Sequence, residues 1–274
     1  MSKADPGLID ALLALIEDML SECALRPVVL GICGAQGSGK STVASALADR
    51  LEQAGVACAV LSLDDLYLPK PAREELAREV HPLLATRGPP GTHDIALGIE
   101  VLDALRAAEP TALPRFDKAR DDQADPASWS RVEGQCQVLL FEGWCVGAVP
   151  QDEAELARPV NDLEAREDAD GVWRRFVNTA LAGSYQALFA RIDRLVLLAA
   201  PGFDVVFDWR VQQEDELRAA RPDGTGIMSR AEVARFVQHY ERITRHVLAE
   251  MPSRADLLVR LDRQRKPVTI GGHA

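Results

Sequence analysis

The stretch GAQGSGKS, residues 34–41, constrains the fold and the chemistry of this chain more than any other part of its sequence. It follows an apolar run, 27–33, and leads into a helix-forming run, 41–55. Glycines in such a loop let backbone N–H groups turn inward around an anion, and the helix behind it adds the partial positive charge of its N-terminus. The stretch fits the pattern G-x-x-x-x-G-K-[ST] without a mismatch. It therefore predicts a phosphate-binding loop, against the alternative of a glycine-rich turn with no ligand.

Residues of the predicted loop are expected to contact the phosphates and the metal ion of a bound nucleoside triphosphate. Lys40 is expected to contact the β- and γ-phosphates, and Ser41 to ligate Mg²⁺. The predicted nucleotide-binding residues of this segment are Gly34, Ala35, Gln36, Gly37, Ser38, Gly39, Lys40, Ser41 and Thr42.

Apolar strands alternate with amphipathic helices along the chain. Each expected strand is a nearly continuous hydrophobic run, as strands buried on both faces of a parallel sheet require. Apolar residues at helical spacing occupy 171–190 and 228–251, and Ser229 with Glu232 predicts a capping box at the start of the second helix. The pattern predicts an α/β fold with right-handed crossovers. The expected strands are 27–33, 56–63, 136–142, 194–200 and 256–261.

Three stretches show no regular period: 64–94, 109–135 and 143–170, all rich in Pro, Asp and Arg. Each opens directly after an expected strand or lies between a strand and the next helix. Because ligands of open α/β sheets gather at the carboxyl ends of the strands, substrate contacts are expected in these stretches.

Composition argues against several classes of function. The net charge of −11 disfavours nucleic acid as a partner, because a phosphate-backbone binder needs a basic face. Five cysteines without a C-x-x-C pair indicate reduced core thiols and a cytoplasmic location. The N-terminal segment, 1–26, is expected to form a surface helix rather than a signal sequence. No membrane partner is expected, because no run reaches the roughly 18 apolar residues of a membrane span.

Acidic residues follow two of the expected strands. Asp64 and Asp65 come directly after the second strand, and Asp64 is the preferred general base for a substrate hydroxyl. The alternative is that one of the two aspartates only caps a turn. Glu142 ends the third strand after four apolar residues, at the position of a Walker B acid, where it is expected to hold Mg²⁺ directly or through water. Asp64, Lys40 and Glu142 are therefore the predicted catalytic residues, and Ser41 and Glu142 the predicted metal ligands.

Six blocks in order, GAQGSGKS, LSLDDLYLP, RGPPGTHD, LPRFDKARDD, LLFEGW and FDWRVQQEDELR, resemble the glycerate kinase branch of P-loop kinases. This branch includes plant-type D-glycerate 3-kinase and its fungal and bacterial relatives. The resemblance covers about residues 28–265. It implies a three-layer α/β/α sandwich with a five-stranded parallel sheet and a helical lid. It also implies ATP with Mg²⁺ and phosphoryl transfer to a hydroxyl of a small acceptor, most directly D-glycerate.

The acceptor is expected to bind within an insertion at 64–135. A carboxylate acceptor such as glycerate needs a cation, ideally a planar guanidinium. For Asp94 the alternative is a simple helix N-cap, for His93 a solvated loop histidine, and for the basic residues of PRFDKAR a solvated hairpin. After FDK the chain reads ARDDQADPASW, where plant-type enzymes have a run rich in glycine and arginine. The predicted acceptor-binding residues are Asp65, Tyr67, Arg87, His93, Asp94, Arg115 and Lys118.

A lid is expected at 202–226, followed by a C-terminal helix and the last strand at 227–265, in a single kinase domain spanning 1–274. A lid excludes water that would otherwise hydrolyse the nucleotide. Arg210 is the predicted lid residue at the phosphates, with Arg218 as a second possibility. Without the resemblance, both arginines are ordinary helix-surface charges paired with Glu214 or Asp215.

Two other functions remain open from the sequence. The acceptor of the same chemistry could be a nucleoside, a pantothenate-like alcohol or a sugar phosphate. A nucleotide-switched binding protein without kinase activity is the alternative of a different class, although the chain contains no N-K-x-D guanine-recognition element.

Overall fold

The computed structural model describes residues 4–220 and 228–272, and its centre is a six-stranded sheet with the order β10-β9-β8-β1-β7-β2. The five expected strands are confirmed, and all of them are parallel. The sixth strand, β10, pairs antiparallel with β9 at the sheet edge. It was missed because it is short and exposed and lacks the apolar run that marks the others. The bounds are β1 Val28–Gly34, β2 Cys58–Ser62, β7 Val138–Gly143, β8 Arg194–Ala199, β9 Leu257–Leu261 and β10 Pro267–Gly271.

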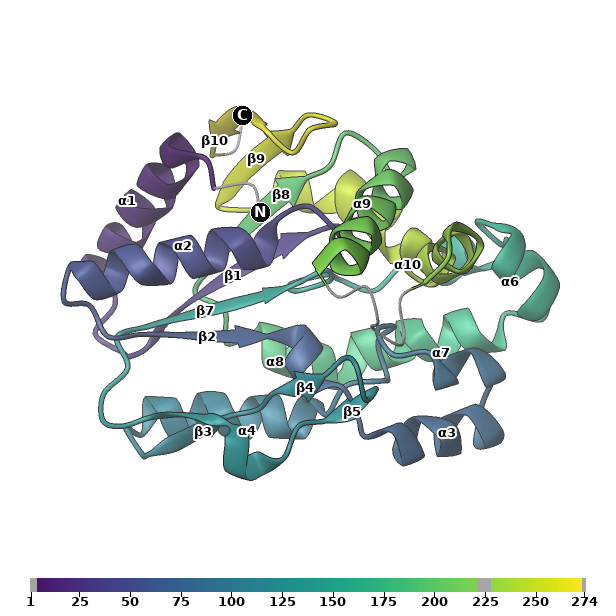
Figure 1. Ribbon diagram of the computed structural model, residues 1–274, viewed down its shortest axis with the longest axis horizontal. Coiled ribbons are helices and arrows are strands. Elements are labelled where there is room, and N and C mark those ends of the chain that lie inside the picture. Colours follow the sequence, from purple (N-terminus) through teal and green to yellow (C-terminus); the bar gives the residue numbers. More distant parts are fainter. Residues whose placement is uncertain (1–3, 221–227, 273–274) are drawn as a thin grey trace.

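Helices cover both faces of the sheet, which gives the expected three-layer sandwich (Figure 1). The core divides in the same way, because alternate residues of β1 point to opposite faces. Leu30 and Ile32 pack with helices α1 (Pro6–Glu22), α2 (Lys40–Gln53) and α9 (Asp204–Ala220). Val29 and Cys33 pack with α4 (Ile95–Arg106) and α7 (Val172–Ala180). Helix α10 (Arg230–Glu250) contributes to both halves of the core.

The stretches without a regular period contain short elements joined by side-chain hydrogen bonds. They hold helices α3 (Lys70–Glu79), α5 (Glu153–Leu156) and α6 (Asp162–Glu167). They also hold two small antiparallel sheets of two strands each, β3 (Thr111–Leu113) with β6 (Ser130–Val132), and β4 (Phe116–Asp117) with β5 (Asp122–Gln123). Elements this short leave no clear hydrophobic period, so the sequence predicted none of them. Helix α8 (Gln186–Phe189) continues α7 through a π-helical turn at Leu181–Tyr185.

Helix α10 begins as its sequence predicts. The Ser229 hydroxyl accepts a hydrogen bond from the N–H of Glu232, and the Glu232 carboxylate accepts one from the N–H of Ser229, so the capping box is present. Helix α1 buries Leu12 and Ile16 while its other face is exposed, which confirms a surface helix.

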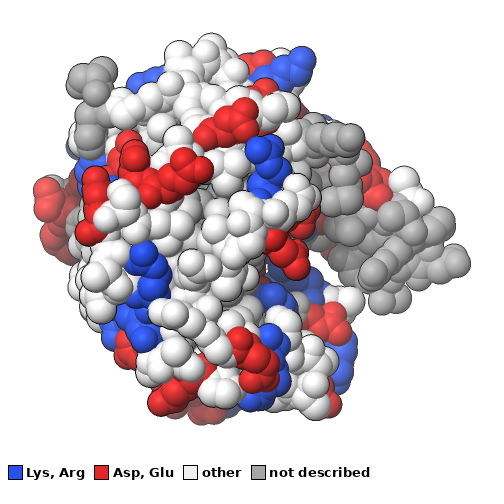
Figure 2. Space-filling model, turned by 90° about the vertical axis from the view of Figure 1, so that its left-hand side faces the viewer, with Lys and Arg blue, Asp and Glu red and all other residues white. Residues whose placement is uncertain are grey.

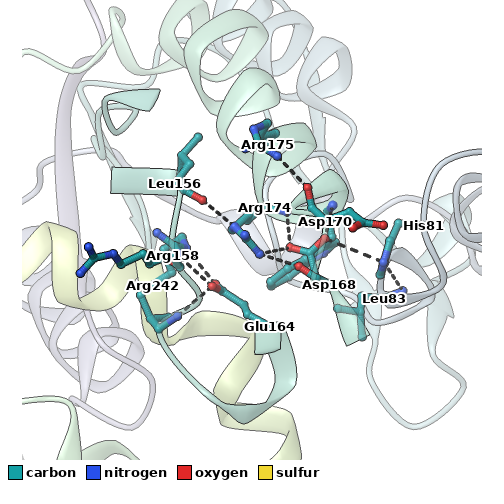
Figure 3. A network of polar contacts seen from close by, with 12 residues as sticks. His81, Leu83, Leu156, Arg158, Glu164, Asp168, Asp170, Arg174, Arg175 and Arg242 are labelled. Atoms are coloured by element: carbon teal, nitrogen blue, oxygen red, sulfur yellow. Dashed lines mark hydrogen bonds and ion pairs between the residues drawn. The ribbon is translucent and has the colours of Figure 1, made fainter. Parts of the chain in front are cut away.

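The segment 151–171 is fastened by two buried arginines from neighbouring helices (Figure 3). From α10, Arg242 donates two hydrogen bonds to the Glu164 carboxylate, at 2.8 and 2.6 Å. From α7, the Arg174 guanidinium pairs with Asp168 at 3.0 Å. All four side chains are buried, so the segment is held against α7 and α10 by charge as well as by apolar contact.

The surface carries charges of both signs. On the face shown in Figure 2, acidic and basic side chains alternate in small groups between uncharged residues. Within 4–220 and 228–272, no helix combines the length and the apolarity that crossing a bilayer demands. Of the lid region expected at 202–226, residues 221–226 lie outside the described residues.

Candidate active site

The glycine-rich loop joins β1 to α2 at the carboxyl edge of the sheet. Gly37 and Gly39 adopt φ values of 76° and 92°, which glycine reaches without strain. A Cβ on Gly37 would lie 2.7 Å from Cβ of Trp209, so a side chain is excluded there on steric grounds as well. Lys40 is buried and its Nζ donates to the carbonyl oxygen of Ala35 at 3.2 Å. The loop therefore has the backbone that the sequence pattern requires.

One observation in the loop indicates room for a ligand. The Ser38 hydroxyl oxygen is buried and has no hydrogen-bond partner among the described residues. Buried polar atoms are rarely left unpaired, because the lost hydration is not replaced. A bound phosphate oxygen would supply the missing partner.

Ser41 and Glu142 meet beside the loop. The Ser41 hydroxyl donates to Oε1 of Glu142 at 2.9 Å, and Glu142 is 5% exposed. Their contact follows from the sheet, because β1 and β7 are neighbours and Ile32 lies opposite Glu142. A hydroxyl and a carboxylate are oxygen ligands of the kind that Mg²⁺ prefers, and Mg²⁺ usually takes its remaining ligands from water and phosphate. The pair fits a magnesium ion without a larger cluster of acidic residues.

The two aspartates after β2 have different surroundings. The Asp64 carboxylate accepts hydrogen bonds from the Tyr67 hydroxyl at 2.6 Å and from Nζ of Lys118 at 2.7 Å. Burial favours the neutral acid, but the Lys118 ammonium outweighs it and holds the pKa of Asp64 well below its usual range. Asp65 instead accepts from the N–H of Phe116 at 3.1 Å and from Arg115 at 2.9 Å. Burial raises the pKa of Asp65 despite these bonds.

A cavity of about 190 Å³ lies between the loop, the end of β7 and helices α9 and α10. It brings together the three predicted catalytic residues, Asp64, Lys40 and Glu142. The other predicted site residues on its wall are Gln36, Gly37, Gly39, Ser41, Thr42, Tyr67, Arg87, Lys118 and Arg210. Two positive side chains, Arg87 and Lys118, thus share a cavity with the phosphate-binding loop.

Four predicted acceptor-binding residues do not line this cavity. Asp65 and Arg115 bond each other beside β4. His93 is buried and its Nδ1 lies 2.5 Å from the Tyr185 hydroxyl, and burial lowers the pKa of this histidine to about 3. The solvated-loop alternative for His93 is therefore wrong. Asp94 accepts from the N–H of Leu97 at 2.9 Å, so its N-cap alternative is confirmed.

The remaining loop residues predicted to bind nucleotide, Gly34, Ala35 and Ser38, lie behind the cavity wall. Gly34 ends β1 and is buried with Ala35 and Ser38. Ser38 does line a second cavity, of about 320 Å³, on the other side of the loop. The loop therefore separates two hollows, and both share Gly37, Gly39 and Thr42.

The sequence missed several residues of the first cavity. Phe236 and Tyr240 of α10 line it, together with Gln213 of α9 and Gly143. Helical spacing in 228–251 marks both aromatic residues only as members of an apolar helix face, and Tyr240 is almost fully buried. Nothing in the sequence marks which turn of an amphipathic helix faces a cavity. Trp144 also lines it.

The two lid arginines differ. Arg210 lines the cavity, forms an ion pair with Glu214 and stacks over Phe236 with its guanidinium carbon 5.6 Å from the ring centroid. Arg218 is half exposed and pairs with Asp215 at 2.6 Å, as the surface-charge alternative expects. The geometry therefore favours Arg210 as the residue that reaches a nucleotide.

Comparisons with known proteins decide the family. The chain is 34% identical over 263 residues to chloroplastic D-glycerate 3-kinase of Arabidopsis thaliana, covering 88% of this chain and 54%, about half, of that relative. It is 38% identical over 225 residues to the uncharacterized kinase mug58 of Schizosaccharomyces pombe, covering 78% of this chain and 79% of the relative. The chain belongs to the glycerate kinase branch of the P-loop kinases. It is accordingly an ATP-dependent small-molecule kinase.

Solved structures agree on the fold of this kinase. D-glycerate 3-kinase from Cryptococcus neoformans matches with a TM-score of 0.80 at 24% identity, covering 97% of this chain and 98% of that one. The model of the methylmalonyl-CoA mutase-associated GTPase MeaB matches only residues 10–67. That segment contains the glycine-rich loop, whereas the two kinase relatives extend over most of the chain.

Proposed function

We propose that this kinase transfers the γ-phosphoryl group of ATP to the 3-hydroxyl of D-glycerate. The observation that carries the proposal is the sharing of one cavity by Asp64, the Lys40 loop and two cations, Arg87 and Lys118. A hydroxy acid needs a base beside its hydroxyl and a cation beside its carboxylate, and the cavity offers both. The names of the Arabidopsis and Cryptococcus relatives support the same acceptor.

The triphosphate lies against the loop between the two cavities. Backbone N–H groups of 35–41 and the N-terminus of α2 surround its oxygens. The base and ribose take the second cavity, because the first is occupied by the charged groups that the reaction needs. Arg265 lines this second cavity and donates to the carbonyl oxygen of Gly37 at 2.6 Å, which fixes the wall of the base site.

Ser41 and Glu142 would hold the magnesium ion that accompanies ATP. The ion would supply positive charge against the negative charge that develops on the phosphate oxygens during transfer. Lys40 and Arg210 add positive charge from the protein on either side. Helix α9 closes over the phosphates and keeps water from the γ-phosphoryl group.

Asp64 accepts the proton of the acceptor hydroxyl as the new O–P bond forms and the bond to the β-phosphate oxygen breaks, which releases ADP. Both of its oxygens are already engaged, by Tyr67 and by Lys118. Tyr67 is 3% exposed and fixed, whereas the Lys118 side chain is 60% exposed and free to turn. The acceptor carboxylate therefore draws Lys118 away from Asp64 and leaves one carboxylate oxygen for the hydroxyl.

A coupled ADP-release assay with D-glycerate, L-glycerate, glycerol, uridine and pantothenate tests the proposal. We expect D-glycerate to give the highest kcat/KM. Asp64→Asn should lower kcat by about 10²- to 10⁴-fold, the usual contribution of a general base, with little change in the KM for ATP. The control is Asp125→Asn, which removes the same charge from an exposed loop.

Two results would count against the proposal in different ways. If none of the acceptors raises ADP release above the rate in water, the kinase has another acceptor class. If Asp64→Asn retains full turnover with D-glycerate, the acceptor is right and the proton acceptor is wrong.

A further inference from the structure

Arg73, on α3, is a buried cation away from the cavity wall. Its side chain is 1% exposed, yet it donates hydrogen bonds to the carbonyl oxygens of Leu68 at 3.1 Å, Ala85 at 2.8 Å and Asp121 at 2.7 Å. Taking a guanidinium out of water costs several kcal/mol, and the cost is offset only when its donors and its charge are satisfied. Three carbonyls accept from three of its five N–H donors, and the carboxylate of Asp121 balances its charge.

The Asp121 carboxylate lies between two guanidiniums. Oδ2 is 3.0 Å from Nη2 of Arg73, and Oδ1 accepts from Nη1 of Arg87. Both guanidiniums also lie over the ring of Phe116, with their central carbons 6.0 Å and 5.6 Å from its centroid. The backbone of Asp121 is left-handed, with φ of 55°, and the bond from Arg73 to its carbonyl oxygen holds this turn in place.

Arg87 is the outer member of this row and reaches the cavity that holds Asp64 and Lys40. Its main chain is fixed as well, because its carbonyl oxygen accepts from the Tyr240 hydroxyl at 2.8 Å and that of Gly88 accepts from Nε1 of Trp144 at 3.2 Å. The ion pair with Asp121 uses one Nη1 hydrogen of a group with five N–H donors. Arg87 is therefore held in one orientation with donors left for a ligand.

We propose that Arg73 and Asp121 are positioning residues that orient Arg87 to bind the carboxylate of the acceptor. The inference rests on the proposed function and adds a specificity element to it: an anionic acceptor is preferred over an uncharged alcohol because Arg87 is fixed before the acceptor arrives. A preorganised guanidinium loses little side-chain entropy on binding, so its two parallel bonds to a carboxylate contribute more affinity.

Asp121→Asn separates this role from two others, because each predicts a different change. Positioning predicts a rise in the KM for D-glycerate of about tenfold, the effect of one misaligned charge-assisted bond. If Asp121 only lowers the positive charge at the site, its removal strengthens anion binding and the KM falls. If Asp121 only links segments of the fold, the KM for D-glycerate stays unchanged. Asp122→Asn is the matched control, since it removes the same charge from the next residue. The Asp122 carboxylate accepts hydrogen bonds only from the backbone N–H groups of Lys70 and Gln123 among the described residues.

The measurements are kcat and KM for D-glycerate, glycerol and ATP with the full-length chain. We expect Asp121→Asn to raise the KM for D-glycerate, to lower the preference for D-glycerate over glycerol by about the same factor, and to leave the KM for ATP within twofold. Arg73→Lys, which keeps the charge but loses the planar fork, should change the D-glycerate KM in the same direction by a smaller factor. If Asp121→Asn does not fold, Asp121→Glu replaces it, and the same rise is expected because the longer arm displaces Arg87.

An unchanged or lowered KM for D-glycerate in the folded Asp121 variant would overturn the positioning role. The fate of the proposed function is read separately, from the unsubstituted protein. If that protein releases no ADP with D-glycerate, the acceptor is wrong, whereas normal turnover with an insensitive Asp121 variant refutes only the present inference.

Discussion

Removing one partner of the buried ion pair between Arg242 and Glu164 should greatly lower the free energy of unfolding. Glu164 is 0% exposed and Arg242 is 6% exposed, and the guanidinium also donates to the carbonyl oxygens of Glu155 at 3.0 Å and Arg158 at 2.6 Å. Arg242→Leu leaves a carboxylate in the interior without its cation, which costs about 3 to 5 kcal/mol. That is a large fraction of the roughly 5 to 15 kcal/mol by which folded domains are stable.

The assay is equilibrium unfolding in urea, with the free energy of unfolding taken from the midpoint and slope. The matched control is Arg235→Leu, the same change two turns earlier on α10, where the partner Glu167 and Arg235 itself are 42% and 51% exposed. An exposed pair contributes at most about 1 kcal/mol, so the control should lose far less.

A double variant, Arg242→Leu with Glu164→Leu, completes the test. It removes the stranded charge and should recover part of the loss, although the two carbonyl oxygens remain without their donor. A loss below about 1 kcal/mol for Arg242→Leu, or equal losses for Arg242→Leu and Arg235→Leu, would refute the reasoning that burial sets the magnitude.

Three further predictions concern the site and its surroundings. Glu142→Gln should raise the Mg²⁺ concentration for half-maximal ADP release by about tenfold or more, because a carboxylate ligand is lost; an unchanged midpoint would remove Glu142 from the metal site. Gly37→Ala should abolish measurable ADP binding in calorimetry, since φ of 76° and the Trp209 side chain both oppose a Cβ, and normal affinity would contradict this. His93, whose pKa burial lowers to about 3, takes up a proton near pH 6.5 only when unfolded, so stability falls as pH drops below 6.5. Between pH 7.5 and 5 the chain should lose about 2 kcal/mol more than His93→Gln in urea unfolding, and equal losses would show that His93 is not the group responsible.

Local sequence was sufficient for the parts of the site that lie within one loop or at one strand end. Gly34 to Ser41 were placed because the pattern, the strand before it and the helix after it all belong to one continuous segment. The sequence indicates a role for Glu142 because a charged residue at the end of a buried apolar strand is rare unless it has a partner or a ligand. The five parallel strands followed from their apolar runs, and their neighbours in the sheet then brought Ser41 and Glu142 together.

Contacts between distant segments could not be predicted. Arg73, Arg87 and Asp121 are spread over almost 50 residues. They meet only because α3 and the loop that carries Arg87 place their guanidiniums over the same ring, Phe116, beside the turn that carries Asp121. Asp65 and Arg115 have the residue types of a binding site, yet they form an ion pair with each other. A sequence does not show whether a charged side chain is paired within the protein or available to a ligand. Strand β10 could not be predicted either, because an exposed edge strand lacks the hydrophobic pattern by which a strand is recognised in a sequence.

The ion pairs that attach the segment 151–171 to α7 and α10 have a consequence for the evolution of substrate preference. Arg242 lies two residues after Tyr240, so the turn of α10 that forms part of the cavity wall is the turn tied to Glu164. Asn161 adds to the same attachment by donating to the carbonyl oxygen of Gln238 at 2.9 Å. A substitution in 151–171 that shifts this attachment moves Tyr240, and with it the space available to the acceptor. Variation in a segment that does not line the cavity is thus a route to a new acceptor that leaves every reacting group unchanged.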